Sequence, residues 1–175
     1  MKSPNSIRKF LTAWIILLVC AVNYSIAKHV LVAAYVSGHS MVPTLKKGDF
    51  VIGVRVPQRS GCIWRLIRSK LVQRRAIVLV RPPAHLGRLE VTRIGGLPGE
   101  LRSWGCGMSR VTGQRIPDEH VFLIGDAVEK FDQPGDLPAD SRLYGPCPSS
   151  AVVARIFVRY WPIARIGYLG IRQSQ

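Results

Sequence analysis

The sequence is short of acidic residues, and this imbalance is its first informative property. Ten Asp and Glu residues stand against 25 Lys and Arg residues in 175 positions, which gives a formal net charge of +15. Such a surplus predicts attraction to an anionic surface, either nucleic acid or lipid headgroups. The sequence contains no recognisable element that reads nucleic acid, so we expect no nucleic-acid partner and favour membrane lipid.

Cysteine and histidine are also scarce. The four cysteines are too few for a disulfide framework and form no Cys-x-x-Cys pair, and the four histidines are not clustered. The sequence therefore predicts no metal site and no organic cofactor. Cys106 and Cys147 either pair outside the cytosol or stay free, and their spacing does not decide between these alternatives.

Only one long hydrophobic run is present. Residues 10–27 are 18 consecutive uncharged positions, and they follow a basic segment, residues 1–9, that has no acid. This length and this flank predict a transmembrane anchor with the N-terminus on the cytoplasmic side and residues 28–175 exported. Two alternatives stay open: a cleaved signal peptide ending at Ser25-Ile26-Ala27, and a buried core helix.

The rest of the chain has the pattern of a β protein. Short apolar runs alternate with Gly and Pro turns, and they predict strands over residues 28–36, 50–54, 77–80, 91–94, 120–124 and 152–158. A single helix is predicted over residues 62–72. We therefore expect a mostly β fold, an antiparallel β-sheet domain formed as a sandwich or partly closed barrel, behind one N-terminal transmembrane helix.

A basic insertion interrupts this pattern at about residues 57–76. The surrounding stretch 50–89 holds nine Lys and Arg residues and no acid. Apolar and basic side chains mixed in this way are typical of an interfacial membrane contact, and the candidate contact residues are Trp64, Arg65, Ile67 and Arg68. The alternative is a solvated basic insertion with its apolar side on the sheet.

The strongest local pattern for chemistry is the stretch 37–49, SGHSMVPTLKKGD. Ser40 follows a predicted strand within a tight turn that contains Gly38. This geometry would expose the hydroxyl and direct the backbone N–H groups of Gly38, His39 and Ser40 towards one point, as a serine nucleophile with an oxyanion hole requires. A serine in a Gly/Pro turn can equally be structural.

Four blocks in this order resemble the type I signal peptidase family: Ser40-Met41-Val42-Pro43-Thr44-Leu45, Arg93-Ile94-Gly95-Gly96-Leu97-Pro98-Gly99-Glu100, Gly125-Asp126 and Asp140-Ser141-Arg142-Leu143-Tyr144-Gly145-Pro146. The resemblance runs from about Tyr35 to Tyr168. It implies a membrane-anchored serine endopeptidase, with a Ser/Lys dyad, that removes signal peptides or presequences after small residues.

The resemblance also implies roles and partners. Ser40 would be the nucleophile, and Asp126, Asp140, Ser141 and Arg142 would support the site. The expected partners are membrane lipid, preprotein or presequence substrates and a second signal-peptidase subunit. The expected location is a bacterial plasma membrane or an organellar inner membrane, with one span.

The general base departs from the family pattern. Thr92 stands where the family has its Lys, and a threonine hydroxyl cannot act as a base near neutral pH. Pro138 stands where the family places a serine near the base. Lys130 is the surrogate base that we favour, followed by His39. The alternative function is a catalytically inactive relative that binds peptides as a chaperone or as a partner of an active peptidase.

Overall fold

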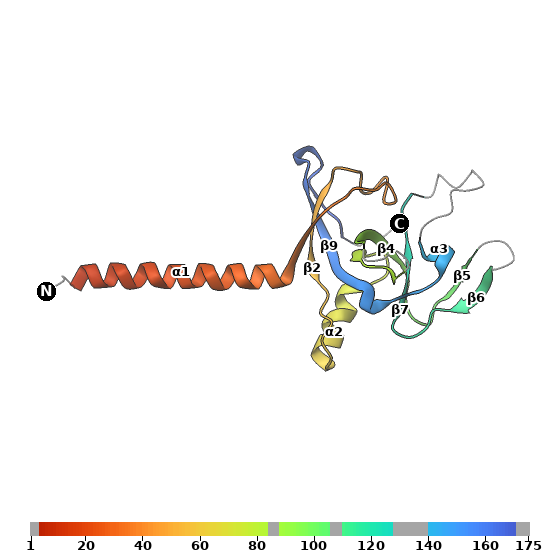
Figure 1. Cartoon of the computed structure of the whole chain (residues 1–175), viewed down its shortest axis with the longest axis horizontal. Helices are drawn as coiled ribbons and strands as arrows, with labels where there is room; N and C mark the ends of the chain where they lie inside the picture. The colour runs from red at the N-terminus through yellow and green to blue at the C-terminus, as the bar shows by residue number, and fades with distance from the viewer. Residues whose placement is uncertain (1–3, 84–87, 106–109, 128–139, 171–175) are drawn as a thin grey trace.

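The computed structural model describes residues 4–83, 88–105, 110–127 and 140–170, and it consists of one long helix and a β-sheet domain (Figure 1). Helix α1 spans Pro4–Val30. Proline is favoured at the first helical position, and Lys28 and His29 occupy the last turn, where cations interact favourably with the helix dipole.

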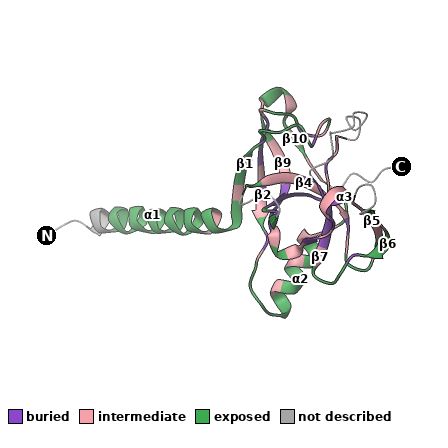
Figure 2. Ribbon diagram, turned by 45° about the vertical axis from the view of Figure 1, so that its right-hand side comes forward, coloured by how far each residue is buried: buried purple, intermediate pink, exposed green. Residues whose placement is uncertain are grey.

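Helix α1 projects from the domain without packing on it. Its segment Arg8–Val30 has a mean hydropathy of 2.0 with no buried residue, and the helix is exposed except at the half-buried Ala27 among its described side chains (Figure 2). The alternative interpretation of residues 10–27 as a buried core helix is therefore wrong. By length and composition this helix can cross a membrane.

The boundary between helix and first strand differs from the prediction. The helix continues through Val30 because no Gly or Pro interrupts it, so the predicted strand over residues 28–36 shrinks to β1, Leu31–Tyr35. The strand begins at Leu31, which pairs with Val54 of the neighbouring strand.

The domain is built on an eight-stranded antiparallel sheet, which confirms the predicted fold class. Its order is β1-β2-β9-β3-β4-β7-β8, with β10 paired to β9. The further bounds are β2 Phe50–Arg55, β3 Ile77–Val80, β4 Glu90–Gly96, β7 His120–Ile124, β8 Cys147–Pro148, β9 Val152–Trp161 and β10 Gly167–Tyr168.

Apolar clusters cover both faces of this sheet. Strand β3 is buried along its whole length: Val78 and Val80 belong to one cluster, and Ile77 and Leu79 belong to the other. Successive side chains of a strand point to opposite faces, so one short apolar run supplies both clusters. The central strands therefore form a stable frame for the loops at their ends.

Helix α2, Cys62–Leu71, occupies the basic insertion and matches the predicted helix to within one residue. Leu71 packs against the first apolar cluster, whereas Ile63 and Leu66 are 72% and 61% exposed. The insertion thus contacts the domain at Leu71, while most of α2 is exposed (Figure 2) and carries apolar side chains into its surroundings.

Several small elements have no clear signal in the sequence: the hairpin of β5 Leu101–Trp104 and β6 Val111–Arg115, helix α3 Ser141–Tyr144, and the 3₁₀ helices η3 Ser149–Ala151 and η4 Ile163–Arg165. In β6 only Val111 is even half-buried, so hydrophobic alternation is missing. The hairpin is held by tertiary contacts instead: the Trp104 ring lies 6.3 Å from that of Phe122.

Candidate active site

Ser40 lies in a loop between β1 and β2 that closes on itself. The Val36 N–H donates to the carbonyl oxygen of Asp49, and the Gly48 N–H donates to that of Val36, both at 2.9 Å. Met41 and Leu45 are 1% and 0% exposed. Ser40 itself is exposed, so it stands at the surface of a loop whose next turn is fixed in the core.

The far side of this loop is tied to the C-terminal strands through Asp49, which is 1% exposed. One carboxylate oxygen accepts a hydrogen bond from Arg165 Nη1 at 2.8 Å, and the other lies 3.5 Å from Arg159 Nη1 and accepts from the Lys46 N–H at 2.9 Å. A buried carboxylate needs such cationic partners, so these bonds fix the loop against β9 and η4.

The backbone after β7 touches Ser40 directly. The Ala127 N–H donates to the Ser40 carbonyl oxygen at 3.0 Å. A Cβ atom added at Gly125 would lie 2.7 Å from the same oxygen, closer than real Cβ contacts allow. Position 125 therefore needs glycine because two backbone segments approach closely there.

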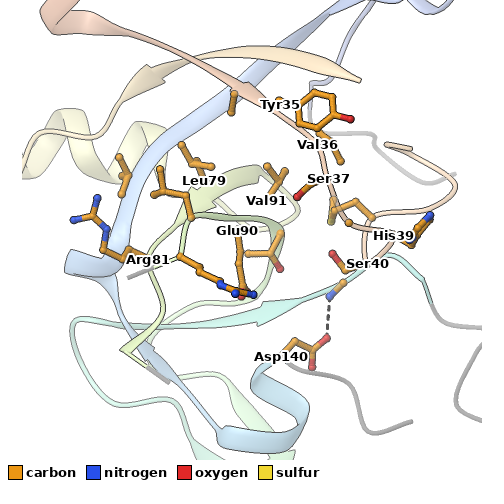
Figure 3. A pocket seen from close by; sticks show the side chains of 18 of the residues that line it. Tyr35, Val36, Ser37, His39, Ser40, Leu79, Arg81, Glu90, Val91 and Asp140 are labelled. Atoms are coloured by element: carbon orange, nitrogen blue, oxygen red, sulfur yellow. Dashed lines mark hydrogen bonds between the residues drawn. The ribbon is translucent and has the colours of Figure 1, made fainter. Parts of the chain in front are cut away.

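Asp140 holds Gly125 in this position. One of its carboxylate oxygens accepts from the Gly125 N–H at 2.9 Å, as Figure 3 shows, and from Arg142 Nη2 at 2.6 Å. The other accepts from the Arg142 N–H at 2.9 Å and so caps α3. The fully buried Ser141 hydroxyl accepts from the Leu123 N–H at 2.9 Å, which fixes α3 to β7.

Asp126, beside Gly125, makes a second ion pair. Arg93 Nε and Nη2 donate to its two carboxylate oxygens at 2.6 and 2.5 Å. Arg93 also donates to the Arg75 carbonyl oxygen at 2.7 Å, which links the end of β7 to the turn before β3. Two-point arginine–carboxylate pairs fix orientation as well as distance.

Thr92 belongs to the wall of the same site. It is 7% exposed, and its hydroxyl donates to the Ile124 carbonyl oxygen at 2.9 Å, one residue before Gly125. The side chain therefore packs against the segment that contacts Ser40. It supplies a structural hydrogen bond and no amine.

A cavity of about 930 Å³ opens in front of Ser40 (Figure 3). One side is formed by residues 32–36 of β1 and its loop, and the other by Leu79 and residues 90–92 of β4. Ser40 and Arg81 lie towards opposite ends, with Val91 and Glu90 between them. The cavity is elongated along the strands and is here named the groove.

The groove is edged by a strand that can accept another. Strand β1 ends the sheet order and pairs with β2 on one side, and no strand of the described residues pairs with its other side. An exposed sheet edge can bind an extended peptide through its backbone groups, while pockets alongside select side chains. The Ser40 loop lies at the end of this edge.

Two groups on and just after α3 have raised pKa values. Burial raises the pKa of the Cys147 thiol from 9.0 to about 11. The pKa of Tyr144, which lines the groove, is raised well above its ordinary value, chiefly by burial and also by the negative charges of Cys147, Glu90 and Asp140. Both groups are therefore neutral at physiological pH.

The candidate replacements for a catalytic lysine have different positions. His39 is exposed and lines the groove next to Ser40. Lys130 and Pro138 lie outside the described residues, as does Cys106, the possible partner of Cys147. No lysine of the described ranges lines the groove, and these ranges hold no group of three or more His, Cys, Asp or Glu side chains arranged for a metal ion.

Sequence reasoning missed part of the groove. The edge role of β1 was not predicted, and neither were Tyr144 and the three arginines Arg55, Arg81 and Arg88 that line the groove. The charge surplus of residues 50–89 was a signal for these arginines. The stretch 50–89 contains nine basic residues, and the pairing of β2, β3 and β9 decides which of them line one cavity.

Comparison with known proteins agrees with this geometry. Residues 7–101, more than half of the chain, match the family "Signal peptidase, peptidase S26". Mitochondrial inner membrane protease subunit 1 of Mus musculus is 30% identical over 135 residues, covering 76% of this chain and 71% of its own.

Two further relatives are similar over comparable lengths. Mitochondrial ATP-independent inner membrane protease subunit 1b of Arabidopsis thaliana is 28% identical, over 78% of this chain and 74% of its own. Signal peptidase I of Leptolyngbya laminosa is 27% identical, over 79% and 72%. The chain therefore belongs to the signal peptidase family, peptidase S26.

Proposed function

We propose that this protein is a membrane-anchored serine endopeptidase of the signal peptidase type, which cleaves signal peptides or presequences after small residues. The observation that carries the proposal is the exposed Ser40 at one end of a groove whose edge, β1, is open to an extended peptide. Family membership supports the same activity.

The chemistry would be acyl transfer in two steps. Ser40 Oγ attacks the carbonyl carbon of the scissile peptide bond, and its proton passes to a base. As the carbon–nitrogen bond breaks, the base returns this proton to the leaving amine. Water then attacks the Ser40 ester, which releases the carboxylate product and restores the hydroxyl.

The oxyanion of each tetrahedral intermediate would be stabilised by backbone N–H groups of the Ser40 turn. Gly38 brings no side-chain donor, so the donation would come from the backbone of Gly38, His39 and Ser40. Asp126, Asp140, Ser141 and Arg142 would act as supports, since their hydrogen bonds hold the segment 125–127 against Ser40.

The base is the unusual part of the proposal. Thr92 would not fill this role, because its hydroxyl is engaged with Ile124 and is far too weak a base. Lys130 is the surrogate that we propose, on the elongated segment after Gly125-Asp126. His39 is the second candidate, because it adjoins Ser40 and lines the same groove.

The proposed setting is the surface of a bacterial plasma membrane or an organellar inner membrane. Helix α1 would be retained as the single anchor, and the β domain would be exported. The mouse relative is named as a subunit. A second signal-peptidase subunit is therefore a proposed partner, together with preprotein or presequence substrates.

Helix α2 would give a second contact with lipid. Of the four candidate residues, Arg65 and Ile67 are exposed, with Ile63 and Leu66 beside them. Arg68 instead donates to the Pro57 carbonyl oxygen at 3.2 and 3.0 Å, and the Trp64 ring lies 5.6 Å from the Arg59 guanidinium. These last two would orient the helix while the exposed residues enter the headgroup region.

A second candidate function rests on Thr92. Without a lysine at that position, the protein would bind peptides in the groove and not cleave them, acting as a chaperone or as a partner of an active peptidase. The open edge of β1 serves this function equally well, because strand addition needs no chemistry.

The test reconstitutes the full chain in liposomes with a preprotein that carries Ala-x-Ala before its cut. Wild type, Ser40→Ala and Thr92→Lys are compared, with Ser60→Ala, at an exposed position outside the groove, as the matched control. Cleavage by wild type and by Ser60→Ala, lost by a factor of roughly 10³ or more in Ser40→Ala, supports the peptidase.

Two other outcomes separate the candidates. Peptide binding without cleavage in wild type, with cleavage gained only in Thr92→Lys, would establish the non-catalytic function. Cleavage that persists in Ser40→Ala would remove Ser40 as the nucleophile and overturn the proposed mechanism.

A further inference from the structure

The end of the groove remote from Ser40 is basic. Arg55, Arg81 and Arg88 are exposed and line the groove there, one from the end of β2, one from the residue after β3 and one from the approach to β4. Arg55 and Arg81 also line a second cavity of about 570 Å³. These two side chains therefore stand where the groove continues into further space.

Strand pairing places this end several residues from Ser40. Tyr35, before the Ser40 loop, pairs with Phe50, and at the other end of the pair Leu31 pairs with Val54, next to Arg55. Arg55 is five positions after Phe50 along β2, or about 17 Å at the usual rise. Because α1 ends at Val30, the basic end is also the end beside the membrane helix.

The three guanidinium groups have no partner within the described ranges. There, Arg55, Arg81 and Arg88 make no hydrogen bond or ion pair through their side chains. Of the described residues that line this end, Glu90 is the one acid, and its charge helps to raise the pKa of Tyr144. Three arginines against one glutamate give the described lining of this end a surplus of positive charge.

We propose that Arg55, Arg81 and Arg88 bind an acidic side chain of the peptide substrate, at about five or six residues from the residue that meets Ser40. The inference rests on the proposed peptide binding in the groove and specifies its substrate class: an extended segment with small residues at the cut and a carboxylate at the remote end. Arginine suits this role because its planar guanidinium pairs with a carboxylate through two hydrogen bonds.

The arginines could also bind a lipid phosphate, because they lie at the end of the domain beside α1. The lining of the groove favours a peptide carboxylate over this phosphate. The same cavity contains Ser40 and all three arginines. A peptide added to the open edge of β1 and running towards α1 has to pass these arginines. A headgroup would have to leave the bilayer surface and enter the groove between β1 and β4.

The experiment measures binding alone, so that cleavage cannot obscure it. The full chain carrying Ser40→Ala is placed in nanodiscs of neutral phosphatidylcholine, and fluorescent peptides with Ala-x-Ala are titrated by anisotropy. In each peptide one Glu, or a matched Gln, is placed at positions about four to seven residues from the cut on either side. The variant Arg55→Gln/Arg81→Gln is compared with Arg110→Gln, which removes one charge from an exposed position outside the groove.

The expected result is that Glu at one of these positions gives roughly five- to tenfold tighter binding than Gln. The preference is expected to vanish in the double variant and to remain in Arg110→Gln. Equal binding of Glu and Gln peptides at every position would overturn the inference and leave the proposed function intact. A Glu preference that survives in the double variant would overturn it as well.

Two outcomes point elsewhere. If no peptide binds to the unaltered groove, the proposed function fails together with this inference. If the double variant loses binding to vesicles containing phosphatidylglycerol, and no Glu preference exists, the arginines meet lipid phosphate and the inference is wrong.

Discussion

The two ends of the groove use the same residue types in opposite ways. At the Ser40 end, Arg93 and Arg142 each pair with a carboxylate, Asp126 and Asp140, at distances of 2.5 and 2.6 Å. At the remote end, Arg55 and Arg81 have no such partner among the described residues. Arginine therefore serves the fold at one end and is free to meet a ligand at the other.

This difference separates two requirements of a peptide-cleaving or peptide-binding site. A nucleophile has to be held within a fraction of an ångström of its position, so its supporting charges are paired and partly buried. A site that selects side chains along an extended peptide has to exchange water for ligand, so its charges stay solvated until binding. Substitutions at the two ends should therefore differ in their effects on stability and binding.

The largest effect on stability is expected for Asp140→Asn. The change removes the negative charge of the carboxylate that accepts hydrogen bonds from Arg142 and from the Gly125 N–H. It should lower the free energy of unfolding by about 3 kcal/mol. The measurement is denaturant unfolding of the full chain in detergent, followed by tryptophan fluorescence. Asp118→Asn, at an exposed position, is the control. Equal stability of the two variants would show that the Ser40 end is not held by its ion pairs.

The burial of Cys147, which is 1% exposed, predicts a pH dependence of stability. The pKa of Cys147 is about 11 in the fold and is near 9 in the unfolded chain, so the folded state holds the thiol proton more tightly. This contribution is present below pH 9 and is lost as the pH rises from 9 to 11, by about 2 to 3 kcal/mol.

The check is the difference in unfolding free energy between wild type and Cys147→Ala, measured from pH 8 to 11. The difference should shrink over this range, because alanine has no proton to lose. A difference that stays constant would mean that water reaches the thiol in the folded protein.

Gly125→Ala should have a smaller effect, about 1 to 2 kcal/mol. The added methyl group would meet the Ser40 carbonyl oxygen, and the two segments would have to move apart. Peptide binding and unfolding are both measured. The matched control is Gly99→Ala, where the strain comes from a positive φ of 84° and nothing lies near the new atom. A loss of peptide binding in Gly99→Ala as large as in Gly125→Ala would argue against the close approach at Ser40.

The smallest effect is expected for Arg81→Gln. Because its guanidinium has no partner within the described residues, the free energy of unfolding should change by less than about 0.5 kcal/mol. Arg93→Gln is the counterpart at the other end and should cost about 2 kcal/mol, since it leaves Asp126 without its cation. Similar costs for the two variants would erase the contrast between the ends.

Much of the fold could be predicted from the sequence. The apolar run 10–27 gave the helix, and Ile77–Val80 gave a central strand, because the patterns of such segments are local. Ser40 could be singled out because the turn chemistry and the ordered blocks around it are also local. The hairpin of β5 and β6 escaped prediction, since its side chains are largely exposed and its position depends on Trp104 packing against Phe122.

The site was predictable as a set of residues and not as an arrangement. Asp126 and Asp140 could be named from the motifs, but their partners could not all be assigned. Arg93 lies 33 residues from Asp126, and the Gly125 N–H lies 15 residues from Asp140. The first pair forms only when β4 and β7 lie side by side, and the second only when α3 packs at the end of β7.

The sequence by itself determined that this protein has one apolar helix and a β-rich domain, and it predicted a serine nucleophile in a tight turn and Thr92 at the position where the family resemblance places a lysine. Each of these follows from the composition of a short window of residues. Only the tertiary structure decided that β1 is an open edge, that Gly125 touches Ser40, and that three of nine arginines and lysines from one basic stretch share a groove with that serine. Strand pairing brings distant residues together, and it depends on which apolar faces can be buried at the same time, a property of the whole chain and not of any window.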